Sequence, residues 1–441
     1  MVSKYKLGSI FFVVAAMLFA VGCSNDDDNN SVAPTPQNSK VRVIHTSYDA
    51  PAVDIRVDGA VAISDLAYGE SSGYAEVQAG TRNVVVTPSG ATSPEVINAN
   101  LPVEANKEYT IIAVDELASI TAIVAEDMRA PNSSKAKIRF VHVAPDAPAV
   151  DIKVGSGMSA PVFSDAQFKD ITNYVEVDAA NYQFVVTAAG NTDEVLVFDE
   201  ISVQNGAVYT VVAHGTFDPT DQYPFAVRVF VDNDPGDAFV DLTVATTNVK
   251  VIHASPDAPG VDILVDNIIV NTAELTYPNN TEYLEALAGT RNIKVNAHMT
   301  TTTVIDADVT FQSDMYYSVF AVNDLANIEP LVLEDDLTSP AAGKAHVRFI
   351  HLSPDAPAVD ITLTDGTVVF GNVSFKESSA FTPLDFGSYD LEVRIAGTTQ
   401  VVLPLGTINL EDGKIYTVFA KGFVSGQGAQ ALGAQIIVNN Q

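Results

Sequence analysis

A histidine followed by two aspartates recurs four times in this sequence, and these side-chain types could perform chemistry together. In each set the first aspartate stands four residues after the histidine and the second stands nine residues after it. An imidazole and two carboxylates gathered by a turn could ligate a divalent cation or transfer protons in acid–base catalysis. The twelve residues are His45, Asp49, Asp54, His142, Asp146, Asp151, His253, Asp257, Asp262, His351, Asp355 and Asp360.

A structural role explains the same pattern more simply. A histidine at the end of a buried strand can donate its ring hydrogen to the turn aspartate or to a loop carbonyl, and this bond would hold the turn in place. Ca²⁺ prefers oxygen ligands alone, and transition metals prefer more nitrogen or sulfur than one histidine supplies. Acid–base catalysis also needs a nucleophile or an activated water in a pocket. We favour the structural role, and the cation site and the acid–base role stay open.

Each set lies inside a longer phrase that recurs at intervals of about 100 residues, so the chain is a tandem repeat. An Asp-Ala-Pro turn follows the histidine in every copy. The four phrases are KVRVIHTSYDAPAVDIRVDG from Lys40, KIRFVHVAPDAPAVDIKVGS from Lys137, NVKVIHASPDAPGVDILVDN from Asn248 and HVRFIHLSPDAPAVDITLTDG from His346.

Apolar alternation with a period of two predicts that these units are built from strands. In the first copy Val41, Val43 and His45 share one face of a strand, whereas Arg42 and Ile44 share the other. We therefore expect the histidine on the core face. Several short strands per unit predict an all-β protein of four tandem immunoglobulin-like or transthyretin-like β-sandwich domains, arranged as a semi-rigid rod.

The expected domains are repeats at residues 40–130, 136–240, 247–337 and 345–441. Polar segments that contain Pro or Gly predict joints at residues 128–136, 232–237 and 335–345. Because these segments are short, we expect them to restrict the freedom of neighbouring domains.

The N-terminal segment predicts export and attachment to a membrane. Lys4 and Lys6 precede an apolar run, so residues 1–22 are expected to be a signal peptide. The run ends at Cys23 in a stretch that resembles a bacterial lipobox, whose cysteine is lipidated. Residues 23–39 then form the lipidated end and a polar tether. An ordinary cleaved signal or a short anchor is the alternative interpretation.

The predicted location is the cell envelope. Ser24 after the cysteine resembles the outer-membrane sorting signal of Gram-negative lipoproteins. We therefore expect a lipid-anchored protein of the outer membrane, and its periplasmic or surface exposure is left open.

Composition excludes some partners. The chain has 23 basic and 55 acidic side chains, with a formal net charge of −32 at pH 7. Because this charge repels phosphates, nucleic acid is not an expected partner.

Cys23 is the only cysteine, so no intrachain disulfide can form. Each repeat is nevertheless long enough to bury a core of its own.

Tyrosines recur as well, at Tyr74, Tyr174 and Tyr283, with Phe381 at the corresponding place in the fourth copy. Aromatic residues at strand positions usually bury the ring and hydrogen-bond the hydroxyl, and we expect that role here. A platform for stacking a ligand is the alternative. The sequence has no tryptophan, which weakens a carbohydrate-binding interpretation.

The motif HxSPDAPxVDIxVDG and the later YTVxA strand resemble the bacterial family called domain of unknown function 4397, over nearly all of residues 40–440. The first copy departs from the motif at Tyr48 and the third at Gly260. The resemblance implies secreted or envelope proteins with tandem β-sandwich-like units and no established activity.

The sequence lacks the common catalytic motifs, including GxSxG, HExxH, Walker loops and Rossmann glycines. We therefore predict a non-enzymatic cell-envelope lipoprotein without a cofactor. It would act as a spacer or as an adhesion or binding module for an unidentified envelope or extracellular partner. The alternative is a module that binds carbohydrate or protein with the help of a divalent cation such as Ca²⁺, and a hydrolase is a further alternative.

Overall fold

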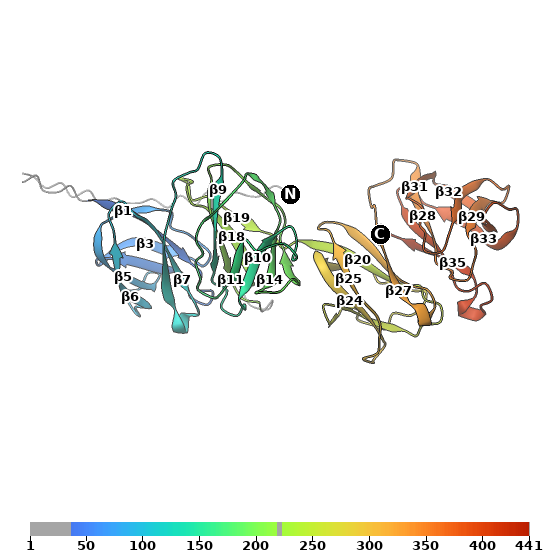
Figure 1. The fold of residues 1–441 in the computed structure, drawn as a ribbon, viewed down its shortest axis with the longest axis horizontal. Helices are drawn as coiled ribbons and strands as arrows, with labels where there is room; N and C mark the ends of the chain where they lie inside the picture. Colours follow the sequence, from blue (N-terminus) through green and yellow to red (C-terminus); the bar gives the residue numbers. More distant parts are fainter. Residues whose placement is uncertain (1–36, 218–222, 441) are drawn as a thin grey trace, which may run out of the picture.

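The computed structural model describes residues 37–217 and 223–440, and strands dominate these residues. Four units follow one another along the long axis of the molecule (Figure 1). We call these units repeats 1 to 4. Each contains two main sheets that enclose a separate apolar core, and repeat 2 has a third sheet of two strands. The prediction of tandem β-sandwich domains is confirmed. No helix in the described part of the chain is long and apolar enough to span a membrane.

Repeat 1 shows the topology that repeats 3 and 4 share. One sheet has the order β4-β1-β7-β8 and the other has the order β3-β2-β5-β6. Strands β1 and β7 are parallel, and the remaining pairs are antiparallel. The strands are β1 (Asn38–His45), β2 (Val53–Val57), β3 (Ala60–Leu66), β4 (Ala75–Gln78), β5 (Gly80–Pro88), β6 (Ile97–Val103), β7 (Glu108–Val114) and β8 (Thr121–Glu126).

Repeats 3 and 4 repeat this strand order. Repeat 3 contains β20 (Thr246–His253), β21 (Val261–Val265), β22 (Ile268–Ile269), β23 (Leu284–Leu287), β24 (Gly289–Ala297), β25 (Thr303–Phe311), β26 (Tyr316–Val322) and β27 (Glu329–Glu334). Repeat 4 contains β28 (Lys344–His351), β29 (Val359–Leu363), β30 (Val368–Val373), β31 (Thr382–Asp385), β32 (Gly387–Ile395), β33 (Val401–Leu410), β34 (Ile415–Lys421) and β35 (Gly433–Val438).

Repeat 2 adds an edge strand, β19, that pairs with β18, and its β13 and β16 form a separate two-stranded sheet. Residues 232–237 form the turn between these two strands, so the prediction of a joint there is wrong. Pro and Gly favour a tight turn inside a sheet as readily as a linker. The strands are β9 (Ala136–His142), β10 (Val150–Val154), β11 (Phe163–Ala166), β12 (Val175–Val177), β13 (Ala180–Tyr182), β14 (Phe184–Ala188), β15 (Glu194–Val197), β16 (Ile201–Val203), β17 (Val208–His214), β18 (Ala226–Val231) and β19 (Phe239–Leu242).

The first strand of each repeat is buried on both faces. Val41 and Val43 of β1 belong to the core of repeat 1, as the alternation predicted. Ile44 points the other way and is only 1% exposed, because repeat 2 covers that face of the sheet. A strand that is apolar on both faces therefore marks a contact between repeats as well as a core.

Candidate functional site

The four recurring histidines are buried at the ends of their strands, with 0–1% of each residue exposed. Each Nε2 donates to the carbonyl of the proline six residues later, since a carbonyl can only accept. Burial lowers the pKa of all four rings, which favours the neutral form. The distances are 3.1 Å for His45 and Pro51, 3.2 Å for His142 and Pro148, 2.9 Å for His253 and Pro259, and 3.0 Å for His351 and Pro357.

The first aspartate of each set binds a distant backbone amide. It accepts a hydrogen bond from a residue in the loop that follows β7, β17, β26 or β34. Because the first strand of each repeat is parallel to this strand, the bond ties the Asp-Ala-Pro turn to the neighbouring loop at the same end of the sheet. The N–H to carboxylate distances are 2.6 Å for Leu117 and Asp49, 2.8 Å for Phe217 and Asp146, 2.8 Å for Leu325 and Asp257, and 2.8 Å for Val424 and Asp355.

The second aspartate links two other segments of the second sheet. In repeat 1 one oxygen of Asp54 accepts from the N–H of Asp65 and the other from that of Gly90, both at 3.0 Å. Asp151 and Asp360 accept two backbone N–H bonds in the same way. Asp262 differs, because it accepts from the Met299 N–H and pairs with a histidine that the other repeats lack. The Oδ1 of Asp262 lies 2.7 Å from Nδ1 of His298.

The histidine and its two aspartates therefore contact different parts of the fold. Of the two partners predicted for the histidine, the loop carbonyl is present, whereas the turn aspartate bonds elsewhere. Within residues 37–217 and 223–440, no group of three or more His, Cys, Asp or Glu side chains is arranged to hold a metal. The observed contacts fasten turns to sheets. The lipidation residue Cys23 lies outside the described residues.

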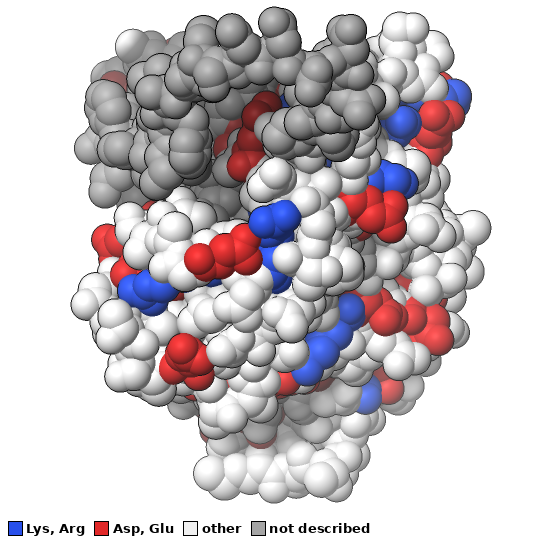
Figure 2. Space-filling view, turned by 90° about the vertical axis from the view of Figure 1, so that its left-hand side faces the viewer, with Lys and Arg blue, Asp and Glu red and all other residues white. Residues whose placement is uncertain are grey.

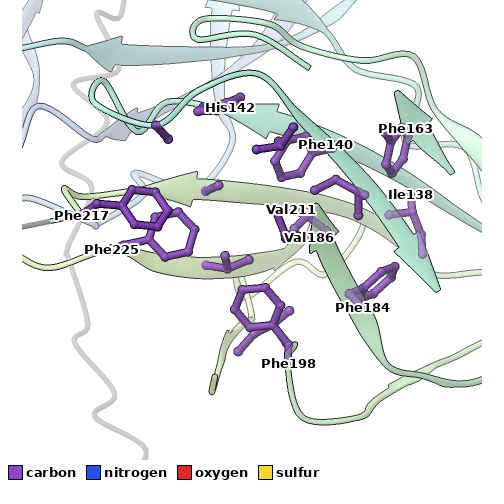
Figure 3. A pocket seen from close by; sticks show the side chains of 16 residues that line it. Ile138, Phe140, His142, Phe163, Phe184, Val186, Phe198, Val211, Phe217 and Phe225 are labelled. Carbon is purple, nitrogen blue, oxygen red and sulfur yellow. The ribbon is translucent and has the colours of Figure 1, made fainter. Parts of the chain in front are cut away.

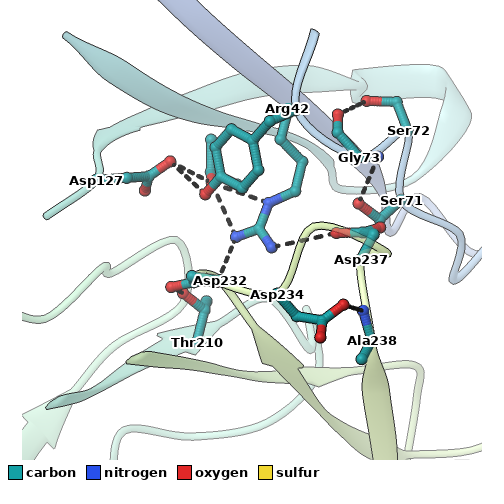
Figure 4. Close-up of polar contacts among 12 residues, drawn as sticks. Arg42, Ser71, Ser72, Gly73, Asp127, Thr210, Asp232, Asp234, Asp237 and Ala238 are labelled. Carbon is teal, nitrogen blue, oxygen red and sulfur yellow. Dashed lines mark hydrogen bonds and ion pairs between the residues drawn. The ribbon is translucent and has the colours of Figure 1, made fainter. Parts of the chain in front are cut away.

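A second recurring set lies between repeats, and the sequence analysis did not single it out. The buried Arg42 of repeat 1 contacts Asp232 of repeat 2 at 2.7 Å, and Asp237 lies 3.7 Å away (Figure 4). In return Arg139 of repeat 2 contacts Asp127 at the end of repeat 1, at 2.5 Å. The two ion pairs thus cross one contact in opposite directions.

Hydrogen bonds within each repeat hold the two carboxylates in place. Tyr74 donates to Asp127 at 2.8 Å, and Tyr174 donates to Asp232 at 2.7 Å. The threonine of each central strand, Thr110 or Thr210, donates to the same carboxylate. The expected hydroxyl partner of the recurring tyrosines is therefore the aspartate of the ion pair.

Apolar side chains surround these ion pairs and complete the contact, which we call pair 1–2. They come from both repeats and are at most 1% exposed, so water is excluded from the charged centre. The residues are Ile44, Ile112, Val114, Val141, Val143, Val212 and Phe230.

Repeats 3 and 4 meet through the same strands, in a contact that we call pair 3–4. Arg348 forms an ion pair with Asp335, and Tyr283 donates to the same carboxylate at 2.5 Å. The second contact between these repeats is not an ion pair of this kind. Lys250 of repeat 3 stands where repeat 1 has Arg42, and Asn439 of repeat 4 stands where repeat 2 has Asp232. The apolar residues are Ile252, Ala254, Phe320, Val322, Ile350, Leu352, Phe419 and Ile437.

The junction between repeats 2 and 3 is built differently. Val185 and Val197 of repeat 2 contact Ala245 and Ala288 of repeat 3 in a small apolar cluster. The next residue, Gly289, has φ +95°, and a Cβ there would lie 2.5 Å from a carboxylate oxygen of Glu194. The backbone next to Gly289 also contacts repeat 2, because the Thr290 N–H donates a hydrogen bond to the Glu194 carboxylate at 2.7 Å. Glycine is therefore required for this close approach.

The sequence contains a signal for the ion pairs. Arg42, Arg139 and Arg348 each stand inside an apolar strand phrase, with Lys250 in the third copy. The acidic partners Asp127, Asp232 and Asp335 each follow the last paired residue of a strand by one position. A recurring cation between apolar residues, and a recurring acid at a strand end, could together have indicated buried pairs.

The charged side chains on the exposed end of repeat 1 are not sorted by sign (Figure 2). Acidic and basic side chains are interspersed on that face, with neither sign gathered in one large area (Figure 2). The net negative charge of the chain is therefore not concentrated on this visible end.

Comparison with protein families agrees with the fold. The model of a family described as "Domain of unknown function (DUF4397)" matches the chain four times, over residues 39–153, 157–241, 247–362 and 362–441. The chain belongs to the DUF4397 family. Its four matches extend over all four β-sandwich repeats.

Other comparisons add little to this DUF4397 assignment. A search of curated proteins found no match. Among solved structures, the Bacillus anthracis TIE protein is similar at 11% sequence identity, with 87% of this chain and 68% of that chain covered. The TM-score is 0.17, so this likeness carries no argument about function.

Proposed function

We propose that this DUF4397 protein is a non-enzymatic lipoprotein of the cell envelope whose repeats form a spacer. A lipid on Cys23 would attach it to the outer membrane, and residues 24–36 would connect the lipid to repeat 1. The distal repeats would then present a binding or adhesion surface to a partner in the envelope or outside the cell.

The observation that supports this proposal is the direct packing of successive repeats. Buried ion pairs and apolar residues join the repeats within each pair. Separating the repeats would expose these buried apolar residues to water, so the contacts resist separation. The proposed spacer would therefore keep its length under thermal motion.

Small-angle X-ray scattering of residues 24–441 tests the spacer. A compact globule of this size would have a radius of gyration of about 22 Å. We expect a clearly larger value and a distance distribution with a long tail. A radius of gyration at the compact value would contradict the proposal.

Gly289→Val tests whether the junction between the two pairs is fixed. The new side chain would meet Glu194 and Val197, so we expect the distance distribution to change. Gly80→Val is the matched control, because Gly80 also has positive φ but meets only the flexible end of Arg82 in its own repeat. An unchanged distribution for Gly289→Val would show that this contact does not set the shape.

A further inference from the structure

Repeat 3 contains a cavity of about 240 Å³ between its two sheets. Its walls come from β20, β23 and β26 of one sheet and from β21, β22, β24 and β25 of the other, and most of the lining side chains are apolar. The apolar space in the core of repeat 2 measures only about 40 Å³, and Phe140, Phe163, Phe184 and Phe198 surround it (Figure 3). Native cores rarely contain voids larger than a water molecule, so the larger cavity needs an explanation.

A shortened edge strand is one cause of the cavity. In repeats 2 and 4 the edge strand places Phe163 or Phe370 opposite a core isoleucine, and both phenylalanines are buried. In repeat 3 the edge strand β22 has two residues, and its pairing with β21 ends before Ile263. The side chain of Asn271 then bonds the Ile263 N–H at 2.7 Å. No phenylalanine ring fills this side of the sandwich.

A small residue on the opposite sheet is the second cause. The inward position of the other edge strand is Val77 in repeat 1, Val177 in repeat 2 and Leu384 in repeat 4, as the strand register shows. In repeat 3 this position is Ala286, which pairs with Thr247 and lines the cavity. Two independent replacements therefore open the same space.

The mouth of the cavity is apolar and acidic. Ile268 lines the cavity and is 70% exposed, and its neighbour Ile269 is 58% exposed. The charged lining residues are Asp266, Glu285 and Arg291. Arg291 forms an ion pair with Asp266 at 3.4 Å and donates to carbonyls of Ala288 and Glu194. The three lining charges sum to −1, with Glu285 as the excess acid, so the mouth should disfavour an anionic ligand.

We propose that this cavity is a binding site for the hydrocarbon group of a small uncharged or cationic molecule. An apolar cavity of about 150 Å³ holds benzene, so the larger space suits a bicyclic ring or a short alkyl chain. The apolar walls would take up the hydrocarbon by excluding water from it. The site belongs to repeat 3, and it does not depend on the spacer role.

Fluorescence titration of the full chain with uncharged N-phenyl-1-naphthylamine tests the site. We expect saturable binding at one site per chain. Ala286→Leu introduces the residue of repeat 4 into the cavity and should weaken binding at least tenfold. Ala60→Leu, at an exposed position of repeat 1, is the matched control and should leave binding unchanged.

A second variant and a charged analogue keep the test decisive. Val270→Phe, at the lining residue that follows β22, fills the cavity from the opposite sheet and should also weaken binding at least tenfold, even if Ala286→Leu unfolds the repeat. The anionic 8-anilino-1-naphthalenesulfonate should bind at least tenfold more weakly than the uncharged probe. Absence of binding to the unaltered chain, or unchanged binding by both filled variants, would overturn the proposal. Equal binding of the two probes would overturn the proposed charge preference.

Discussion

Pair 1–2 and pair 3–4 are built from equivalent strands and equivalent sequence positions of their repeats, but their buried charges differ. Arg42 and Arg139 face Asp232 and Asp127, so each cation of pair 1–2 has a carboxylate in the other repeat. Pair 3–4 holds two cations, Arg348 and Lys250, and its counterpart of the second aspartate is Asn439. The second pair therefore lacks one of the two carboxylates that balance the first.

The pKa values of the buried cations reflect this difference. Burial alone would lower the pKa of Arg42, but nearby carboxylates, chiefly Asp232, raise it above its ordinary value. For Arg348 burial outweighs Asp335, and the pKa is lowered. Burial also lowers the pKa of Lys250, whose Nζ lies 4.2 Å from the centre of the Tyr283 ring.

This comparison shows how one scaffold can set two strengths of contact. Both pairs have an apolar shell of similar size, so the shell alone does not distinguish them. A buried cation without a full partner keeps its desolvation cost. We therefore expect pair 3–4 to separate more readily than pair 1–2, and hydrogen exchange in β17 and β34 would compare them.

The largest expected effect comes from making pair 1–2 resemble pair 3–4. Asp232→Asn leaves the buried Arg42 with the carboxylate of Asp237, which lies 3.7 Å away. We expect a loss of about 3–4 kcal/mol in the unfolding free energy of repeats 1 and 2, because a buried pair would be broken. Urea unfolding followed by hydrogen exchange in β17 measures the loss.

An exposed ion pair of the same repeat provides the control for Asp232→Asn. Asp178, whose side chain is 79% exposed, pairs with Lys135 at 3.0 Å. Asp178→Asn should cost less than about 1 kcal/mol. If the two variants lose the same stability, the buried charges do not distinguish the pairs.

Acid should weaken pair 1–2 through a histidine that pair 3–4 lacks. The buried His214 lies 2.6 Å from the Tyr68 hydroxyl of repeat 1, and burial, with a smaller effect of Arg228, lowers its pKa to about 4. Asp241 acts in the opposite direction. Pair 3–4 has Lys421 at the matching end of β34.

The sign of the pH effect follows from that lowered pKa. Below pH 6.5 the unfolded chain binds a proton at His214 that the folded chain does not bind until about pH 4. Stability from this residue is therefore complete above pH 6.5 and is lost as the pH falls to 4, by about 2–3 kcal/mol. Hydrogen exchange in β17 from pH 7 to 4 measures the loss, and His214→Gln should remove this part of it. An identical acid response in the variant would rule out His214 as the cause.

A smaller gain is expected from supplying the missing carboxylate of pair 3–4. Asn439 hydrogen-bonds Thr417 at 2.9 Å, at the position where the other repeats have an aspartate. Asn439→Asp should stabilise repeats 3 and 4 by about 1–2 kcal/mol, because Lys250 gains an opposite charge. Exchange in β34 is the measurement, with Asn409→Asp at an exposed position of repeat 4 as the control. Destabilisation by Asn439→Asp alone would show that the carboxylate is not what pair 3–4 lacks.

Local patterns in the sequence predicted the sandwich fold well, because they are set by nearby residues. Val41 and Val43 alternate onto the core face, and His142 lines its core beside Phe140. Asp266 and Asn267 form a hairpin turn with φ values of 49° and 68°, as short polar turn residues allow. Periodicity and turn chemistry carry this information directly.

Contacts between distant parts of the chain could not be predicted in the same way. The partner of Asp49 is an amide 68 residues later, so spacing within the phrase suggested a histidine partner instead. Alternation placed Arg42 with Ile44 on the second face of the strand and indicated no partner for it, and its partner Asp232 lies in a segment that was predicted to be a joint. Only the packing of two repeats places these two residues together.

The smallest expected effect is that of Ca²⁺, and it would act on both pairs alike. The His and Asp turns occur in all four repeats, so a cation bound there would raise the unfolding temperature of pair 1–2 and of pair 3–4 together. We expect no difference between melts of residues 24–441 in Ca²⁺ and in EDTA, because the carboxylates already accept backbone N–H bonds. A parallel rise of both transitions in Ca²⁺ would restore the cation site. A rise of one transition alone would instead indicate a site in that pair, and the difference between the pairs would then not rest on buried ion pairs alone.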